Sequence, residues 1–239
     1  MAKKTKKKSL DVFNYLITHN NPKSPIAEAY RTLRTNLGFA AVDKQCRSIM
    51  VTSSNPQEGK STTTANLAVA LAQAGSKTVL IDCDLRKPIV HHIFRLPNHQ
   101  GLTNCLTQKK TIEEVCHMEV MENLTVVTSG PIPPNPAELL GSQSAKELWP
   151  DLLDKYDYIL IDSPPVLAVA DATVLASQMD GVVLVVHSGK SRTEAIREAK
   201  GQLLKGNANI IGVVLNQVNM NSGDYQYYYY YASDSPAES

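Results

Sequence analysis

The hydrophobic pattern of this chain alternates between short apolar runs and longer segments whose apolar residues recur at helical spacing. The short runs predict buried strands, at residues 49–51, 79–81, 124–127, 159–161, 181–186 and 210–215. The longer segments predict helices, among them residues 25–41, 65–74, 101–106, 111–121 and 192–204. Apolar strands that alternate with helices are typical of a parallel sheet covered on both faces. The pattern therefore predicts an open α/β fold with a mostly parallel sheet.

Prolines mark the breaks in the middle of the chain. Residues 129–136 carry four prolines, which predict an extended loop because the residue before a proline disfavours the helix. A helix is expected to restart there, with Asn135 as its cap and Pro136 at its first position. Trp149-Pro150 predicts a further turn.

The two ends of the chain differ in composition from the middle. Residues 1–20 include five lysines at positions 3, 4, 6, 7 and 8, and residues 220–239 hold six of the ten tyrosines. Both ends are predicted to be disordered tails, which leaves one domain at residues 21–219. Each lysine would add about 1 kcal/mol of attraction to an anionic membrane. Without an apolar anchor, the basic end could assist a membrane location but not create one.

Composition limits the class of protein further. The chain has 239 residues and an apolar share of 43%, which is ordinary for a soluble globular protein. Its net charge of +1 is too small to attract nucleic acid over the whole surface. The four cysteines form no paired motif, which favours reduced thiols in a cytosolic protein over a zinc or iron–sulfur site. No apolar stretch reaches the roughly 18 residues of a membrane span.

A polar turn joins the first predicted strand to the helix after it. Such a turn can wrap its backbone N–H groups around a phosphate, with Lys60 reaching the outer phosphates and the Ser61 hydroxyl ligating magnesium. The first glycine of the usual motif is replaced by Ser54, and an ordinary turn with an exposed lysine is the alternative interpretation. The predicted nucleotide-binding residues of the turn are Ser54, Asn55, Pro56, Gln57, Glu58, Gly59, Lys60, Ser61 and Thr62.

Carboxylates follow two of the predicted strands, at the edge where open parallel sheets bind ligands. Asp82 and Asp84 follow the strand at 79–81, and Asp162 follows the strand at 159–161. Carboxylates beside a phosphate loop suit magnesium ligation and proton abstraction, and Asp162 has the position of a Walker B residue. For one of the two residues Asp82 and Asp84, the alternative role is to cap the N-terminus of the next helix.

The predicted helix at residues 25–41 carries Glu28, Arg31 and Arg34 at three-residue steps, so these side chains share a face. They form either a surface with one weak ion pair or a polar subunit interface, and the pattern alone does not choose between them.

The tyrosines of the C-terminal end cannot all be buried at regular spacing. A sticky low-complexity end and a swapped strand are two explanations, but neither accounts for an exposed run of phenols. Phosphorylatable hydroxyls on a flexible tether, in a chain with an ATP site, suggest that they are substrates. The predicted acceptors are Tyr225, Tyr227, Tyr228, Tyr229, Tyr230 and Tyr231.

Taken together, these motifs resemble the bacterial tyrosine kinases of capsular and exopolysaccharide synthesis, in the form where the kinase is a separate cytoplasmic chain. The resemblance covers residues 20–231. The matching segments are residues 54–61 (Walker A), 79–86 (the second Walker motif of that family), 129–138, 159–164 (Walker B), the Glu28/Arg31/Arg34 oligomerisation motif and the tyrosine cluster.

The resemblance implies a P-loop NTPase-type fold and an ATP-dependent protein-tyrosine kinase that uses Mg²⁺. Ser61, Asp82 and Asp162 would organise the metal directly or through water. Asp82 or Asp84 would help deprotonate the tyrosine, and Arg86 would orient these groups. Asn216, after the last strand, lies where related ATPases contact adenine. The implied catalytic residues are Lys60, Asp82, Asp84, Arg86 and Asp162.

Partners and location are implied as well. Copies would assemble into a ring through the helix at 25–41 and phosphorylate one another, and about −1.5 to −2 charges per phosphotyrosine would disperse the ring. The cytoplasmic tail of a transmembrane polysaccharide co-polymerase or adaptor would activate the kinase and recruit it peripherally to the inner face of the membrane. A phosphotyrosine phosphatase and other protein-tyrosine substrates would complete the system.

Two other classes of protein compete with this interpretation. A partitioning or septum-positioning ATPase of the same P-loop branch would be a switch without kinase activity, but such proteins carry a second lysine early in the loop, where this chain has Asn55. A nucleotide-binding regulator could use the tyrosine tail only as a docking peptide. Detection of phosphotyrosine would distinguish the kinase from both.

Overall fold

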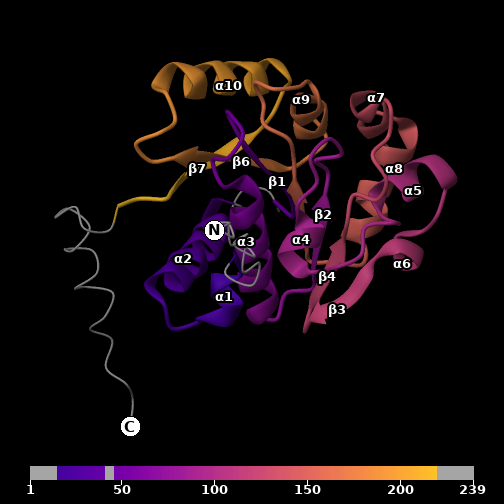
Figure 1. Cartoon of the computed structure of the whole chain (residues 1–239), viewed down its shortest axis with the longest axis horizontal. Helices are drawn as coiled ribbons and strands as arrows, with labels where there is room; N and C mark the ends of the chain where they lie inside the picture. Colours follow the sequence, from indigo (N-terminus) through magenta and orange to yellow (C-terminus); the bar gives the residue numbers. More distant parts are fainter. Residues whose placement is uncertain (1–14, 41–45, 220–239) are drawn as a thin grey trace, which may run out of the picture.

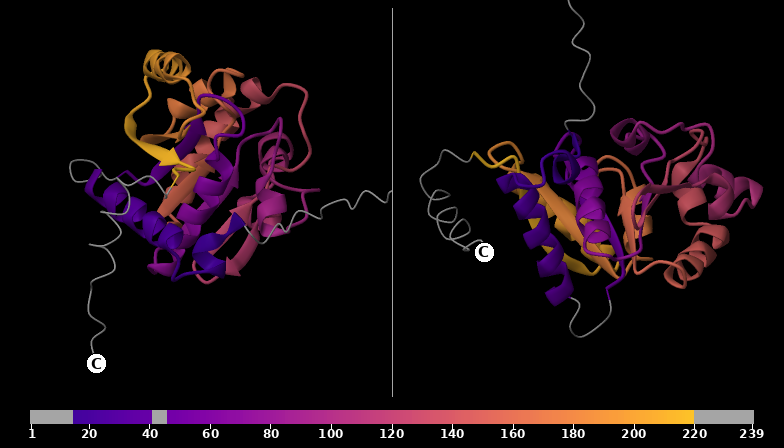
Figure 2. Two further views of the ribbon diagram at one scale, coloured as in Figure 1. Left: turned by 60° about the vertical axis from the view of Figure 1, so that its left-hand side comes forward. Right: turned by 90° about the horizontal axis from the view of Figure 1, so that it is seen from below.

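The computed structural model describes residues 15–40 and 46–219. Their centre is a seven-stranded sheet in the order β3-β4-β2-β5-β1-β6-β7, with helices on both faces (Figures 1 and 2). The strands are β1 (Ser48–Ser53), β2 (Thr78–Asp82), β3 (His117–Met121), β4 (Leu124–Val127), β5 (Tyr158–Asp162), β6 (Gly181–His187) and β7 (Ile210–Asn216). The helices are α1 (Ile17–Asn20), α2 (Pro25–Ala40), α3 (Lys60–Gln73), α4 (Val90–Phe94), α5 (Leu102–Gln108), α6 (Ile112–Val115), α7 (Pro136–Leu140), α8 (Gln143–Leu153), α9 (Asp171–Ala176) and α10 (Thr193–Lys205). The terminal lysines and tyrosines singled out above lie outside the described residues.

Neighbouring strands of this sheet run parallel except at the β3–β4 edge, where the pair is antiparallel. The pairing register places Asp82 of β2 directly beside Asp162 of β5, and Asp162 in turn beside Val51 of β1. The mostly parallel α/β fold predicted from the hydrophobic pattern is confirmed. The register also brings the phosphate loop and both strand-end aspartates to one edge of the sheet.

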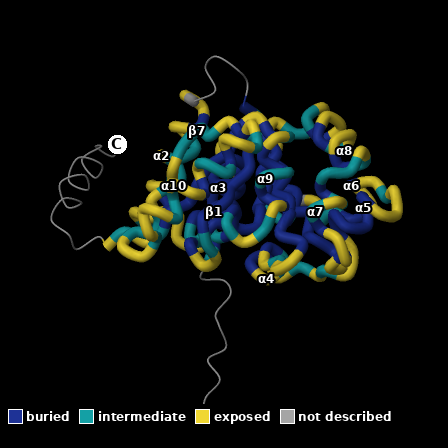
Figure 3. Tube along the Cα trace, turned by 90° about the horizontal axis from the view of Figure 1, so that it is seen from above, coloured by how far each residue is buried: buried dark blue, intermediate teal, exposed yellow. Residues whose placement is uncertain are grey.

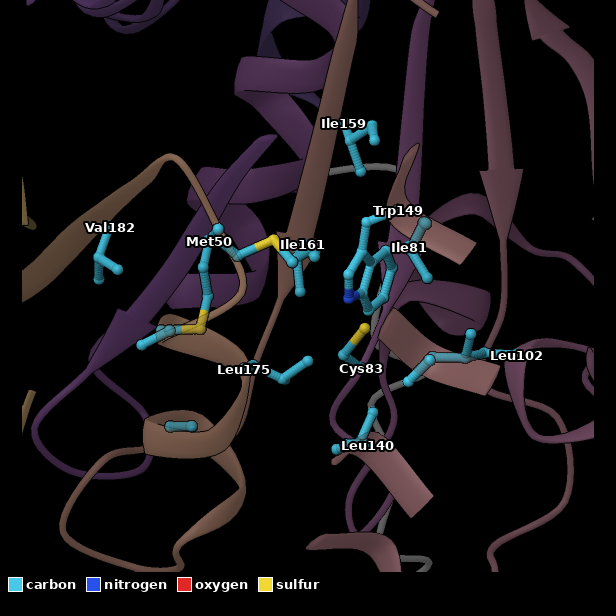
Figure 4. Close-up of a cluster of buried hydrophobic side chains, with 14 of the residues drawn as sticks. Met50, Ile81, Cys83, Leu102, Leu140, Trp149, Ile159, Ile161, Leu175 and Val182 are labelled. Carbon is cyan, nitrogen blue, oxygen red and sulfur yellow. The ribbon is translucent and has the colours of Figure 1, made fainter. Parts of the chain in front are cut away.

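Two apolar layers lie on opposite faces of the sheet, because successive side chains of a strand point to opposite sides. In β1, Ile49 and Val51 pack into the layer that contains α3, whereas Met50 packs into the layer with Trp149 of α8. Figure 3 shows the buried positions running through the centre of the molecule, and Figure 4 shows Trp149 beside Ile81 and Cys83. Burial of apolar residues on both sides explains why the strands read as continuous apolar runs.

The helix predicted at residues 111–121 is wrong over its second half. Only the short helix α6 forms there, and the chain then enters β3, which pairs with β4 through Met121 and Leu124. The two-residue connection contains Asn123 in the left-handed region (φ 62°), a conformation that asparagine tolerates in tight hairpins. The prediction failed because an edge strand with one exposed face can imitate helical spacing over a few residues.

The turn predicted at Trp149-Pro150 is also wrong, since α8 continues through both residues. Pro150 cannot donate a backbone hydrogen bond, which is unfavourable inside a helix. Trp149 is buried, and its indole Nε1 donates to Gln178 at 3.0 Å, while Leu152 is buried one turn further on. These tertiary contacts hold the helix across the proline.

The domain begins earlier than residue 21. Thr18 is fully buried, and both its backbone N and its Oγ1 donate to Asn66 Oδ1 on α3, each at 3.0 Å. Leu16 packs into the α3 layer as well. Residues 15–20 are therefore part of the packed domain and not of a flexible tail. No helix among the described residues has the length and hydropathy needed to cross a membrane.

Candidate active site

The phosphate loop connects β1 to α3 at the edge of the sheet where the parallel strands end. Gln57 and Gly59 both take positive φ values, 64° and 96°, and these let the loop turn sharply into the helix. Lys60 and Ser61 are the first residues of α3, and both are buried. The predicted strand–turn–helix context of the loop is confirmed.

Lys60 is the centre of the site. Its Nζ lies 3.0 Å from Asp84 Oδ2, 3.4 Å from Asp162 Oδ1 and 3.2 Å from Ser61 Oγ. Burial alone would lower the pKa of Lys60, but the carboxylates of Asp162 and Asp84 outweigh burial and raise it above its usual value. Lys60 is therefore a charged group held between two carboxylates at the start of α3.

Asp82 is held by backbone donors. Its Oδ1 accepts from the backbone N of Asp84 at 3.2 Å, and its Oδ2 accepts from Ile89 and Val90 at 3.1 and 3.0 Å. This is the helix-capping role left open for one of the two aspartates, since α4 begins at Val90. Burial raises the pKa of Asp82 to about 8, and the neighbouring Asp162 charge adds to the shift.

Asp162 fits a metal ligand. Its side chain is fully buried, and its Oδ2 has no hydrogen-bond partner among the described residues. Burial raises the pKa of Asp162, although Lys60 acts against that shift. A buried carboxylate oxygen without a partner, in a site that also contains the Ser61 hydroxyl, is an oxygen donor of the kind that a hard cation such as Mg²⁺ prefers. The oxygens of Asp82 already accept from backbone N–H groups, so water-mediated contact suits it better.

Arg86 does not contact the aspartates it was expected to orient. Its Nε and Nη2 donate to Asp171 at 2.8 and 3.0 Å, in a bidentate pair that joins the segment after β2 to the start of α9. Asp171 is fully buried and was not identified from the sequence. A carboxylate as the single charged residue of the stretch at 166–176 was the available signal, since such a group needs a partner.

Asn216 braces the phosphate loop from the end of β7. Its Nδ2 donates to the backbone O of Glu58 at 3.0 Å. A Cβ at Gly59 would lie 1.9 Å from the same Nδ2, so glycine is required there by packing as well as by its backbone angle. In this arrangement the Asn216 amide contacts the loop backbone, and its expected contact with adenine stays a prediction.

Gly59→Ala should therefore disable the loop. Overpacking costs about 1–3 kcal/mol, and a loop that shifts to relieve this strain must return to its present shape on binding, which lowers Mg-ADP affinity on the order of tenfold or more. Titration with a fluorescent ADP analogue measures the effect. Gly201→Ala is the matched control, because no atom lies within 4 Å of its Cβ position in α10, and its affinity should equal that of the unmodified protein. Normal binding by Gly59→Ala would show that the loop can move away from Asn216.

The polar residues of α2 are not equivalent. Arg31 Nη1 contacts Glu28 Oε2 at 2.5 Å, in an exposed ion pair, and Arg31 also donates to the backbone O of Pro22. Arg34 Nη1 instead reaches the backbone O of Ala70 on α3, at 3.2 Å. Part of the predicted interface motif thus attaches α2 to its own domain.

The fold and the site together define a P-loop nucleotide-binding domain. In agreement, a family model described as an AAA domain matches residues 46–205. Tyrosine-protein kinase YwqD of Bacillus subtilis (strain 168) is 48% identical over 214 residues, which cover 89% of this chain and 90% of that protein. Putative tyrosine-protein kinase CapB of Staphylococcus aureus is 42% identical over 229 residues, which cover 96% of this chain and 99% of that protein.

Solved structures of tyrosine kinases and of a related ATPase are also similar to this chain. The crystal structure of the chimerical protein CapA2B2 matches with a TM-score of 0.82 and 44% identity, covering 86% of this chain and 91% of that one. The kinase domain of Escherichia coli tyrosine kinase ETK matches at 0.83 and 32%, covering 87% and 82%. The septum site-determining protein MinD of Pyrococcus horikoshii is more distant, at 0.63 and 26%, covering 74% and 72%. The chain belongs to the bacterial tyrosine-protein kinase family.

Proposed function

We propose that this chain is an ATP-dependent protein-tyrosine kinase that phosphorylates its C-terminal tyrosine cluster in trans and regulates capsular or exopolysaccharide synthesis and export. The observation that carries the proposal is the buried cluster in which Lys60 meets Asp84, Asp162 and Ser61 at the phosphate loop. A fixed cation, paired carboxylates and a helix N-terminus are the groups that phosphoryl transfer needs for positioning and charge stabilisation.

Each group has a role in this proposal. Lys60 and the loop amides hold the phosphates. Ser61 and Asp162, with Asp82 nearby, would hold Mg²⁺, which when bound would supply positive charge to neutralise the phosphates. Asp82 or Asp84 accepts the proton of the tyrosine hydroxyl. The phenolate oxygen then bonds to the γ-phosphorus while the bond to the ADP oxygen breaks, so ADP leaves and phosphotyrosine remains.

The direct test is incubation of the purified protein with Mg-ATP, with and without the cytoplasmic tail of a co-encoded transmembrane co-polymerase or adaptor. Phosphotyrosine is then mapped by mass spectrometry. Label at residues 225–231 is the expected result, with more label when the activating tail is present. ATP hydrolysis without phosphotyrosine in either condition would favour a partitioning-type ATPase switch.

The proposal includes assembly and recruitment. Copies associate in a ring through α2, repulsion between phosphotyrosines disperses the ring, and a phosphatase restores it. The membrane partner's tail, assisted by the basic N-terminal residues, brings the kinase to the inner face of the membrane. The exposed Glu28–Arg31 pair and the exposed Ile26 and Phe39 of the same helix support an interface there.

Replacing Glu28, Arg31 and Arg34 by Ala should leave a monomer, because the interface loses its charged groups. Multi-angle light scattering of the unphosphorylated protein measures the mass. Arg197→Ala with Glu198→Ala, on the exposed side of α10, is the control and should keep the large assembly. A large assembly in the α2 variant would refute the role of this helix.

A further inference from the structure

Glu58 is a buried carboxylate inside the phosphate loop. It is 3% exposed and directly precedes Gly59. No ion pair to Glu58 occurs in the part of the chain that the structure describes. A buried anion without a cation is expensive unless several donors surround it. A carboxylate would also repel a nucleotide phosphate bound in the same loop. Its presence therefore calls for a structural role that outweighs this repulsion.

Three hydrogen-bond donors surround the Glu58 carboxylate. Ser54 Oγ lies 2.9 Å from both carboxylate oxygens, and the backbone N of Asn55 donates to Oε2 at 3.1 Å. Ser191 Oγ, from the turn after β6, donates to Oε1 at 2.5 Å. The carboxylate therefore closes the loop on itself and fastens it to a separate segment of the domain.

Ser191 is itself fixed in place. Its Oγ accepts from the backbone N of His187 at 2.9 Å, and its own backbone N donates to His187 O at 3.0 Å. Asn216, at the end of β7, holds the backbone O of Glu58. The last two parallel strands of the sheet thus brace the phosphate loop through the side chain and the backbone of one residue.

We propose that Glu58 is a positioning residue that preforms the phosphate loop before nucleotide arrives. Ser54 occupies the place of the usual first glycine, and its bond to Glu58 supplies the constraint that keeps this turn closed. The bond to Ser191 makes the loop and the turn after β6 one rigid unit. Preforming a site in this way raises affinity by reducing the ordering cost of binding. The inference rests on the proposed function only in that the loop binds nucleotide.

The negative charge of Glu58 could either weaken nucleotide binding by repelling the phosphates or strengthen it by holding the loop in place. The two effects predict opposite changes in Mg-ADP affinity. If repulsion of the phosphates were its main effect, Glu58→Gln would tighten Mg-ADP binding. If positioning dominates, Glu58→Gln weakens binding, because an amide NH₂ would face donors that need an acceptor. Ser191→Ala removes one donor and no charge, so it separates positioning from repulsion.

Isothermal titration with Mg-ADP tests the proposal without any need for kinase activity. Glu58→Gln and Ser191→Ala should each weaken binding by about tenfold, as expected for a hydrogen bond to a charged group. The double variant should lose less than the sum of the two single losses, because Ser191 and the Glu58 side chain belong to one hydrogen-bonded unit. Ser191→Thr, which keeps the hydroxyl, should restore binding. Ser177→Ala, at the residue that follows α9, is the control for loss of a serine hydroxyl.

A second measurement covers variants that fold poorly. Thermal midpoints are recorded for each protein, and Ser191→Ala carries the test if Glu58→Gln does not fold. In assays of tyrosine phosphorylation, Ser191→Ala should raise the ATP KM by a larger factor than it lowers kcat. Tighter binding in Glu58→Gln, or purely additive losses in the double variant, would overturn the proposal. Absence of phosphotyrosine with the expected binding pattern would affect only the kinase assignment.

Discussion

Lys60→Met should abolish both Mg-ATP binding and tyrosine phosphorylation, with an affinity at least about 100-fold lower than that of the unmodified protein. Lys60 is the cation among the carboxylates of Asp84 and Asp162, at 3.0 and 3.4 Å. Without it, the phosphates would enter a site whose carboxylates have lost their counter-ion. Removal of one partner of a buried ion pair costs about 3–5 kcal/mol, so some loss of stability is expected as well.

Titration calorimetry with Mg-ADP and phosphotyrosine detection measure the two losses separately. Thermal unfolding then shows whether the variant is folded at the assay temperature. Lys155→Met is the matched control, since Lys155 pairs with Glu113 where both side chains are about half exposed. It should bind nucleotide normally, because exposed ion pairs contribute little. A folded Lys60→Met protein that still labels its tyrosines would refute the site assignment.

Changing the six tyrosines of the C-terminal cluster to Phe should remove self-labelling and leave nucleotide affinity unchanged. Phenylalanine keeps the ring but lacks the hydroxyl that accepts the phosphoryl group. The measurements are incorporation of labelled phosphate and Mg-ADP titration on the same preparation. The substituted residues are Tyr225, Tyr227, Tyr228, Tyr229, Tyr230 and Tyr231.

Tyr156→Phe serves as the control, because Tyr156 lies within the domain, packed against its buried core. Its variant should incorporate as much phosphate as the unmodified protein. Label that persists in the six-Phe variant would place the acceptor elsewhere in the chain. Weaker nucleotide binding in that variant would mean that the tail contributes to the nucleotide site itself.

Local patterns explain what could be predicted from the sequence. The central strands are buried on both faces, so they read as apolar runs, and the helix predicted from residue 25 matches α2 over its described residues, Pro25–Ala40. Parallel strands end at one edge, which made the meeting of Lys60 with Asp84 and Asp162 predictable without any side-chain geometry.

Contacts between distant segments explain what could not be predicted. The proline inside α8 is tolerated because Trp149 is buried and bonded to Gln178, which lies in another part of the chain. The partners of Arg86 and Glu58 are 85 and 133 residues away in sequence, at Asp171 and Ser191. No local spacing indicates either pair, although a carboxylate in an apolar or phosphate-binding context indicates that some partner must exist.

The contact of Lys60 with its own carboxylates has a consequence for how the protein responds to ionic strength. Charges on a surface are neutralised by mobile ions, whereas Lys60 already carries fixed counter-ions in Asp84 and Asp162 within the domain. Dissolved salt screens such buried pairs much less than exposed ones. In the proposed function, nucleotide entry would exchange these carboxylates at Lys60 for phosphate oxygens, without exposing the lysine to dissolved ions. Occupancy of this site should stay nearly constant across salt concentrations that would dissolve a purely electrostatic contact with a membrane surface.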